Sequence, residues 1–156
     1  MIRLAQEKDT KAILQLLRQV CHVHHQVRPD IFKDYATKFT HEELKEIIVK
    51  QEEPIYVYVD ENDQVLGHLF LLIKVSDSPV RYPSKRLFIE DLCVDSSARG
   101  QRIGQQLCNF AKNLAREWEC SSLTLNVWND NTSAYDFYDH LGFKPQQTQM
   151  ELLLQD

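Results

Sequence analysis

The chain has 156 residues, a net charge of −5 and a hydrophobic content of 43%. This length suits one domain, so we expect residues 1–156 to form a single domain around one core. The acidic balance argues against nucleic acid as a partner, because such binding needs clustered Lys and Arg, but it suits a cationic substrate. The N-terminus does not read as a signal peptide, and no apolar run reaches the roughly 20 residues of a membrane span. We therefore expect a cytoplasmic protein with no membrane partner.

The four cysteines form no Cys-x-x-Cys pair. Each lies in an apolar periodic segment, which is typical of reduced, mostly buried thiols in a cytosolic protein. The stretch "CHVHHQVRPD" brings one of them, Cys21, close to three histidines, but no second ligand pair follows at zinc-finger spacing. We therefore expect no metal site. The histidines belong either to the wall of a substrate site or to a solvated helix end.

The first half of the chain predicts one strand and two helices. Alternating apolar residues predict an opening strand at residues 1–5. Asp9 is placed to cap a helix with a regular apolar stripe. The stripe fades over residues 22–36, where Pro29 and mixed polarity predict a loop or a broken helix. Thr40 and the glutamate three residues later form a capping box for a second helix, which we expect to run to residue 50.

The second half predicts a hairpin and a strand-helix-strand crossover. Two strands over 54–75 are joined by a polar turn. A loop at 76–85 precedes a third strand at 86–94. Further elements are expected in this order: a helix at 103–118, a strand at 122–128, a helix at 131–142 ended by Gly142, and a closing strand at 150–155. The order β-α-α-β-β-β-α-β-α-β predicts an α/β or α+β fold, with a mixed sheet flanked by helices.

Two of only four glycines, Gly100 and Gly104, lie between an apolar strand and an apolar helix. Backbone N–H groups at such a turn have no helical acceptor, and together with the helix dipole they favour an anion. Residues 99–104 therefore predict a cradle for a pyrophosphate, with close packing of the helix as the plain alternative. The loop lacks the Lys-Ser/Thr of a Walker motif, and its place after a late strand does not suit a dinucleotide fingerprint.

The stretch "VDSSARGQRIGQQL" resembles the acyl-CoA loop of the GNAT superfamily of N-acetyltransferases, Gln/Arg-x-x-Gly-x-Gly/Ala. Arg99 and Gly104 match its ends, while Arg102 stands where the pattern has its first glycine. Independently, "NVWNDNTSAYDFYDHLGFK" resembles the later motif Asn-x-x-Ala-x-x-Phe-Tyr-x-x-x-Gly-Phe. The matching residues are Asn131, Ala134, Phe137, Tyr138, Gly142 and Phe143. The resemblance covers about residues 85–145 strongly, and the order of elements extends it to most of the chain.

The resemblance implies a GNAT-like fold, with a mostly antiparallel mixed sheet, and an acetyl-CoA-dependent N-acetyltransferase. The acetyl group would pass from acetyl-CoA, the co-substrate, to a primary amine of a small molecule or peptide by direct attack in a ternary complex. The resemblance places cofactor contacts at Leu92, Cys93, Val94, Arg99, Gly100, Gln101, Arg102, Ile103, Gly104, Asn131 and Tyr138.

Tyr138 matches the tyrosine with which similar enzymes protonate the CoA sulfur, and its plain alternative is a core tyrosine.

Glu90 and Asp91 interrupt an otherwise apolar strand, and an acid among apolar neighbours is costly unless it is paired or used. Adjacent strand residues face opposite sides unless a bulge intervenes. We expect Glu90 to act as base through water, with Asp91 as the alternate base or as a ligand for the substrate cation. A salt bridge is the alternative for either, and His22 and Arg28 are further expected substrate contacts.

Two other functions stay open. The first is a non-catalytic acyl-CoA sensor or interaction module on the same fold. The second is a nucleotide-binding regulator that uses the loop for another diphosphate. The amine acceptor and the oligomeric state also stay open, with a homodimer as the assembly that similar proteins suggest.

Overall fold

The computed structural model describes residues 1–154, which fall into two compact units, residues 1–126 and residues 127–154. The first unit contains β1 (Ile2–Leu4), η1 (Glu7–Asp9), α1 (Thr10–Val27), α2 (His41–Lys50), β2 (Ile55–Val59), β3 (Val65–Ser78), β4 (Arg81–Val94), η2 (Ser96–Ala98), α3 (Ile103–Glu117) and β5 (Ser122–Leu125). The second unit contains α4 (Thr132–His140). None of the helices in residues 1–154 has the length and apolar character that crossing a membrane requires.

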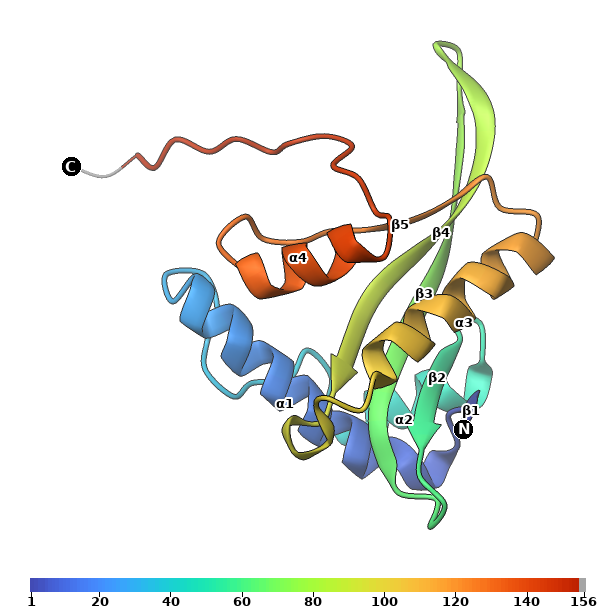
Figure 1. The fold of residues 1–156 in the computed structure, drawn as a ribbon, viewed down its shortest axis with the longest axis vertical. Helices are drawn as coiled ribbons and strands as arrows, with labels where there is room; N and C mark the ends of the chain where they lie inside the picture. Colours follow the sequence, from blue (N-terminus) through green and yellow to red (C-terminus); the bar gives the residue numbers. More distant parts are fainter. Residues whose placement is uncertain (155–156) are drawn as a thin grey trace. The chain divides into compact units, whose positions relative to one another are not determined.

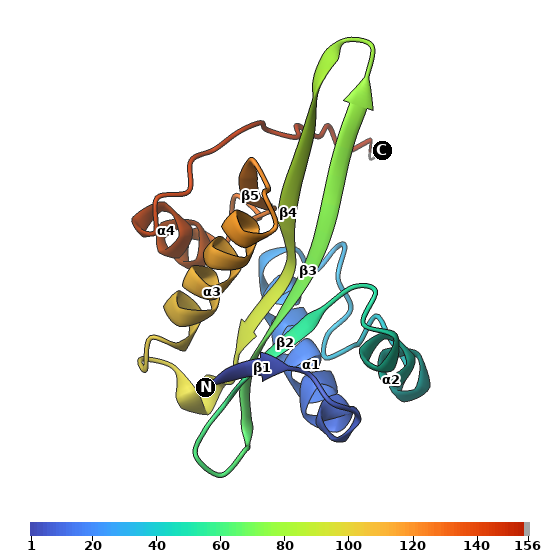
Figure 2. The same cartoon turned by 90° about the vertical axis from the view of Figure 1, so that its right-hand side faces the viewer.

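The first unit is built on one five-stranded sheet with the strand order β1-β2-β3-β4-β5. Neighbouring strands run antiparallel except β4 and β5, which are parallel. Helices α1 and α2 lie on one face of this sheet and α3 on the other (Figures 1 and 2). The mixed, mostly antiparallel sheet flanked by helices confirms the expected fold class.

An apolar cluster of buried residues lies between α1, α2 and the sheet. Its members alternate along β2 and recur at helical spacing along α1, as one buried face of each element requires. They are Ala5, Ile13, Leu14, Leu17, Leu44, Ile48, Ile55, Val57, Val59 and Phe70. The capping box predicted for α2 is confirmed, because Thr40 and Glu43 exchange side-chain to backbone hydrogen bonds of 3.2 Å.

Helix α3 approaches the sheet closely at Gly67 on β3. A Cβ atom at this position would lie 2.9 Å from the carbonyl oxygen of Cys93 and 3.3 Å from Cδ1 of Leu107. Such distances leave no room for a methyl group, and the first neighbour is backbone that cannot rotate away. The absence of a side chain at Gly67 therefore allows α3 to pack closely against β3 and β4, and β4 leads into the glycine loop.

We expect Gly67→Ala to lower the free energy of unfolding by about 1–3 kcal/mol, because the added methyl group overpacks the contact between β3, β4 and α3. Urea denaturation followed by circular dichroism measures this change. Asp77→Ala, at an exposed position on the same strand, serves as the control and should change the stability by less than about 0.5 kcal/mol. An equal effect of both variants would contradict the close-packing argument.

The expected loop or broken helix at 22–36 is wrong for residues 22–27, because α1 continues to Val27, and is confirmed for residues 28–36, which belong to no helix or strand. Its histidines take part in the helix, which ends at Val27. Arg28 is the C-cap and precedes Pro29, and a following proline disfavours helical backbone. Asp9 occupies the N-cap position of α1 but makes no side-chain cap to it. Its carboxylate instead accepts hydrogen bonds from Arg3 at 2.8 and 3.1 Å and from the Gln6 backbone N–H at 2.7 Å.

The segment expected to be a loop at 76–85 instead extends β3 and β4 into one long hairpin. The two strands pair as far as Ser78 and Arg81, so only residues 79–80 form the turn (Figure 2). The sequence pattern missed these strands because they bury neither face, and alternation of apolar and polar residues marks only half-buried strands.

The expected closing strand at 150–155 is also wrong for residues 150–154, which form no strand, while residue 155 lies outside the described residues. Met150, Leu152 and Leu154 are between 83% and 91% exposed. Strand structure needs a ladder partner, and no strand of the described chain pairs with this segment. Alternating apolar residues alone could not supply that partner.

Candidate active site

The loop that follows β4 is held by side-chain caps. Asp95 caps the short helix η2, accepting hydrogen bonds from the backbone N–H of Ser97 at 2.9 Å and from its hydroxyl at 2.6 Å. Gln19 of α1 donates to Asp95 at 3.0 Å and accepts from the Ser96 N–H at 3.1 Å. The Ser97 hydrogen bond, assisted by Gln19 and the charge of Arg99, keeps the pKa of Asp95 below its ordinary value. The start of the glycine loop is therefore fixed in position.

Backbone with positive φ shapes the predicted cradle at 99–104. Gly100 has φ of 84°, and Arg102, the N-cap residue of α3, lies in the left-handed region at φ 59° and ψ 24°. Gly104 is the second residue of α3, and Ile103 before it points its side chain into the core. Backbone that turns in this way at a helix N-terminus directs N–H groups toward a common point, which suits an anion.

The structure gives Arg102 a conformation that glycine adopts without cost. In the resembling motif a glycine occupies this position, and here an arginine holds the same left-handed backbone. Its side chain is exposed and makes no cap hydrogen bond to the helix. The residue type at this position differs from the pattern, but its backbone conformation is one that glycine favours.

Strands β4 and β5 pair only over part of β4. Their parallel ladder runs from Arg86 to Ile89, whereas the antiparallel ladder of β4 with β3 continues to Val94. Residues 90–94 therefore have a strand neighbour on the β3 side, while the β5 ladder has already ended. Within the first unit this leaves one backbone edge of Leu92, Cys93 and Val94 next to the glycine loop without a strand partner.

Cys93 turns its side chain away from that edge. Its thiol is buried and donates to the carbonyl of Leu16 at 3.4 Å. Burial, with the charge of Asp91, raises the pKa of the Cys93 thiol to about 12. The thiolate needed for nucleophilic attack is therefore scarce at neutral pH, so Cys93 is suited to cofactor contact through its backbone only.

A bulge in β4 decides the arrangement of the two acids. Asp91 pairs with Phe70 and Ile89 pairs with Leu71, so Glu90 is an extra residue with no partner of its own across the ladder. Such a bulge lets successive side chains depart from strict alternation. As a result both carboxylates reach the same ammonium group, that of Lys38, at 3.6 Å from Glu90 and 3.9 Å from Asp91.

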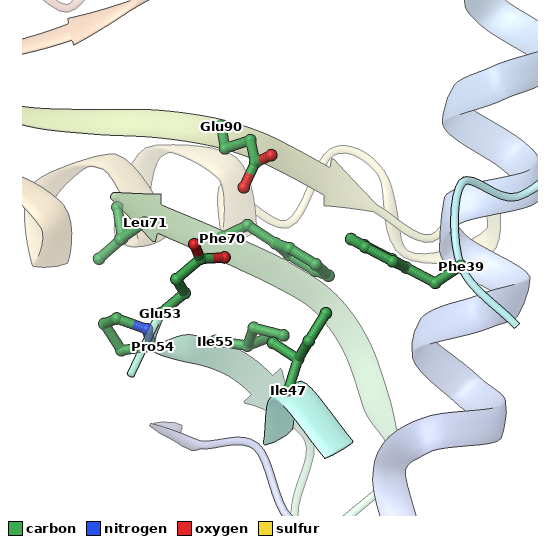
Figure 3. Close-up of a pocket in the computed structure, with 8 residues that line it drawn as sticks. All are labelled: Phe39, Ile47, Glu53, Pro54, Ile55, Phe70, Leu71 and Glu90. Atoms are coloured by element: carbon green, nitrogen blue, oxygen red, sulfur yellow. The ribbon is translucent and has the colours of Figure 1, made fainter. Parts of the chain in front are cut away.

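Glu90 lines a small pocket, shown in Figure 3. The other lining residues are Phe39, Ile47, Glu53, Pro54, Ile55, Phe70 and Leu71. The cavity volume is about 10 Å³, which is the room that one water molecule needs. A water held here would lie within reach of the Glu90 carboxylate.

Asp91 is mostly buried and paired. Its Oδ1 lies 3.2 Å from Nε2 of His68, a fully buried histidine on β3. Burial pushes the pKa of Asp91 upward, but the hydrogen bond and charge of His68, together with the charges of Lys38 and His24, outweigh it and hold the pKa below its ordinary value. Asp91 is therefore an ionised group that serves better to hold a cation than to accept a proton.

Residues of the second unit make local contacts. The Asn131 side chain accepts a hydrogen bond of 3.2 Å from the Ala134 N–H and so caps α4. The Tyr138 ring packs edge-on against Phe137 at 5.0 Å and against Phe143 at 5.5 Å. Gly142 follows the helix with φ of 95°, which confirms its expected role as the C′ residue. The helix-cap reading of Asn131 and the aromatic-packing reading of Tyr138 both have structural support.

Two of the expected substrate residues are engaged elsewhere. Nδ1 of His22 lies 2.7 Å from Asp34, and its ring stacks on Tyr35. Arg28 forms a two-point ion pair with Asp30, with contacts of 2.9 and 2.7 Å. These contacts are with residues 30–35.

The structure adds His68 and Lys38, which sequence reasoning did not assign to the site, and His24, one of the histidines for which a substrate-site wall was one of two alternatives. Burial lowers the pKa of His24, and its ring packs against Phe32 at 4.9 Å. His68 carried one usable signal, a single histidine in an otherwise apolar strand. Lys38 carried none, because both of its carboxylate partners are more than 50 residues away. All four cysteines fall within residues 1–154 and are free thiols there, and no group of metal-binding side chains occurs in that range.

Residues 17–143 match the family model described as the acetyltransferase (GNAT) family. The chain belongs to this family. It is 31% identical to the peptidyl-lysine N-acetyltransferase YjaB of Salmonella typhimurium, over 74% of the chain and 68% of that relative. It is 28% identical to the thialysine N-epsilon-acetyltransferase of Bos taurus, over 91% of the chain and 82% of that relative.

The GNAT assignment extends to the fold. A mutant of the BH1408 protein from Bacillus halodurans superimposes with a TM-score of 0.92 at 27% identity, covering 99% of both chains. The family match supports an acyltransferase, and the names of both relatives are those of N-acetyltransferases. The family resemblance expected from the two motifs is confirmed.

Proposed function

We propose that this GNAT protein transfers the acetyl group of acetyl-CoA to a primary alkylamine of a small molecule or peptide, by direct attack in a ternary complex. The observation that carries the proposal is the early end of the β4–β5 ladder at Ile89, beside a loop suited to a diphosphate. It leaves a backbone edge that runs from the loop to the two acids. An amide-bearing cofactor arm can pair with such an edge as a further strand.

In this proposal the cofactor is held mainly by backbone. Residues 99–104 would receive the diphosphate, and the edges of Leu92, Cys93 and Val94 would pair with the pantetheine amides. The donor set fits acetyl-CoA, because it offers N–H groups at a helix N-terminus and both N–H and C=O groups along the strand. Asn131 would add a cofactor contact, as the motif match implies, while it caps α4. When bound, acetyl-CoA supplies the activated acetyl group.

Glu90 is the proposed base. An alkylamine has an ordinary pKa near 10.4, so at neutral pH it arrives protonated and must lose a proton before attack. The one-water cavity beside Glu90 supports removal of that proton through water. Asp91 is less suited to this task because His68 already holds it ionised, and it would instead attract the substrate cation.

Tyr138 is the proposed acid. The departing CoA sulfur resembles a cysteine thiol, with a pKa around 8.5, and a phenol with a pKa near 10 can protonate it as the bond breaks. The motif match supports this role. The packing of Tyr138 between Phe137 and Phe143 would fix the direction of its hydroxyl group.

Two observations support an alkylamine as the acceptor: the names of two relatives and the negative charges around the bulge. The names of two relatives specify a peptidyl lysine and thialysine, and both molecules end in an alkylammonium group. Around the bulge this chain offers two carboxylates and the rings of Phe39 and Phe70, which are the groups that attract such a cation. A cytoplasmic location and a homodimer remain further proposals.

The decisive test is a thiol-release assay with acetyl-CoA across lysine, thialysine, polyamines and lysine peptides. We expect turnover with at least one of them. Calorimetry with acetyl-CoA and with ADP distinguishes the proposed enzyme from the two alternative functions. Acetyl-CoA binding without turnover on any amine would favour a non-catalytic sensor. Equal binding of ADP and acetyl-CoA without thioester cleavage would favour a nucleotide-binding regulator.

We expect Glu90→Gln to lower kcat by about 10²-fold or more, since general-base catalysis contributes on this order. The KM for acetyl-CoA should stay near that of the native enzyme, because Glu90 is not among the proposed cofactor contacts. Asp91→Asn is the paired variant and should raise the amine KM more than it lowers kcat. The opposite pattern, with kcat lost in Asp91→Asn only, would assign the base to Asp91.

A further inference from the structure

The ammonium group of Lys38 occupies the surroundings that we assign to the acceptor amine. Its Nζ lies 3.6 Å from Oε1 of Glu90 and 3.9 Å from Oδ2 of Asp91. It also lies 5.4 Å from the ring centroid of Phe39 and 5.5 Å from that of Phe70, and these two rings stack at 6.3 Å. Figure 3 shows Phe39, Phe70 and Glu90 around this region.

This environment differs from that of an ordinary surface lysine. Lys45 and Lys50, for comparison, each contact a single carboxylate, on Glu7 and Glu46. Lys38 contacts two carboxylates that a bulge has brought to one side, together with two aromatic rings. Its side chain is 42% exposed, so a reagent can reach the nitrogen without unfolding the chain.

We propose that Lys38 is a self-acetylation site, at which Nζ accepts the acetyl group from acetyl-CoA bound to the same chain. This inference rests on the proposed function, because it uses the same base and the same cofactor. It adds an acceptor that belongs to the protein itself. Lys38 and Glu90 belong to the same unit of the structure, so the acceptor and the base meet without any other molecule.

The chemistry balances without a further reactant. Glu90 takes one proton from the Lys38 ammonium through water, and the neutral nitrogen then attacks the thioester carbonyl carbon. A C–N bond forms and the C–S bond breaks. The CoA sulfur leaves with the electron pair and takes a proton from Tyr138, which recovers it from the second proton of the amine through solvent. The products are N-acetyl-Lys38, free CoA and one proton.

The modification would change the charge at the site. An acetylated lysine is neutral and no longer pairs with a carboxylate. Glu90 and Asp91 would then no longer be paired with the ammonium group of Lys38. An incoming alkylammonium substrate could bind the two carboxylates without displacing Lys38. Self-acetylation would in this way convert a site closed by its own lysine into one open to an external amine.

The test uses the full chain incubated with acetyl-CoA and no amine, followed by digestion and mass spectrometry of the lysine peptides. Lys33 is the internal control, since it is an exposed lysine in the same segment. We expect Lys38 to gain an acetyl group at least about tenfold faster than Lys33, because a positioned intramolecular acceptor outpaces a diffusing one. The rate should not depend on protein concentration. In Gly104→Trp, which is designed to lose the cofactor, Lys38 should fall to the rate of Lys33.

Other outcomes would overturn the proposal in distinguishable ways. If Lys38 reacts no faster than Lys33 while an external amine is acetylated, self-acetylation is wrong and the proposed function stands. If the rate rises in proportion to protein concentration, the transfer occurs between molecules and the intramolecular site is wrong. If neither Lys38 nor any external amine is acetylated although acetyl-CoA binds, both proposals fail.

Discussion

Gly104→Trp is expected to weaken acetyl-CoA binding by at least about 100-fold, which corresponds to roughly 3 kcal/mol. Gly104 is the second residue of α3, where backbone N–H groups are free of helical acceptors and the proposed diphosphate approaches. An indole ring at this position would fill the space that the phosphate oxygens need, and no rotation of the side chain restores contact with the backbone. Isothermal titration calorimetry with acetyl-CoA measures the loss directly.

The control for this variant is Lys112→Trp, which places the same ring at an exposed position farther along α3. It should bind acetyl-CoA as tightly as the native chain. Circular dichroism of both variants shows whether the fold is kept. Retained affinity in a folded Gly104→Trp chain would mean that the cofactor does not bind at residues 99–104.

Tyr138→Phe is expected to lower kcat by about 10²-fold or more while leaving the KM for acetyl-CoA nearly unchanged. The substitution removes one hydroxyl oxygen, so the ring can keep its packing against Phe137 and Phe143. Only the proton for the departing sulfur is lost, and general-acid catalysis contributes on this scale. A spectrophotometric assay of thiol release with the best amine acceptor gives both constants.

Tyr135→Phe is the matched control, because Tyr135 lies on the same helix and is 38% exposed. It should turn over like the native enzyme. Equal kcat values for Tyr138→Phe and native enzyme would leave Tyr138 with its packing role only. The departing thiolate would then have to be protonated by solvent or by another group.

The local signals in the sequence predicted their elements well. The capping box at Thr40 and Glu43 and the αL glycine at Gly142 depend on residues within one or two turns of each other, and both are confirmed. The strand-loop-helix order around residues 86–117 likewise follows from composition and periodicity. Interactions of this kind lie within a short window of the chain, so a single sequence contains all the information that they need.

The outer hairpin and the closing strand could not be predicted in the same way. Strand structure depends on a partner elsewhere in the chain, and periodicity registers only which face is buried. The polar ends of β3 and β4 pair although they bury little, whereas the apolar segment 150–154 has no ladder. At the hairpin, strands form without an apolar pattern, and at 150–154 an apolar pattern occurs without a strand.

The sequence by itself determined the family, the loop at 99–104 and the two acids at 90–91, because each is written in adjacent residues. Only the tertiary structure decided which groups those acids contact. The bulge at Glu90 is a register shift against β3, and the contacts of Lys38 and His68 with the acids span 52 and 23 residues. Such contacts form when distant segments pack on one sheet face, and neither spacing nor composition along the chain encodes that proximity.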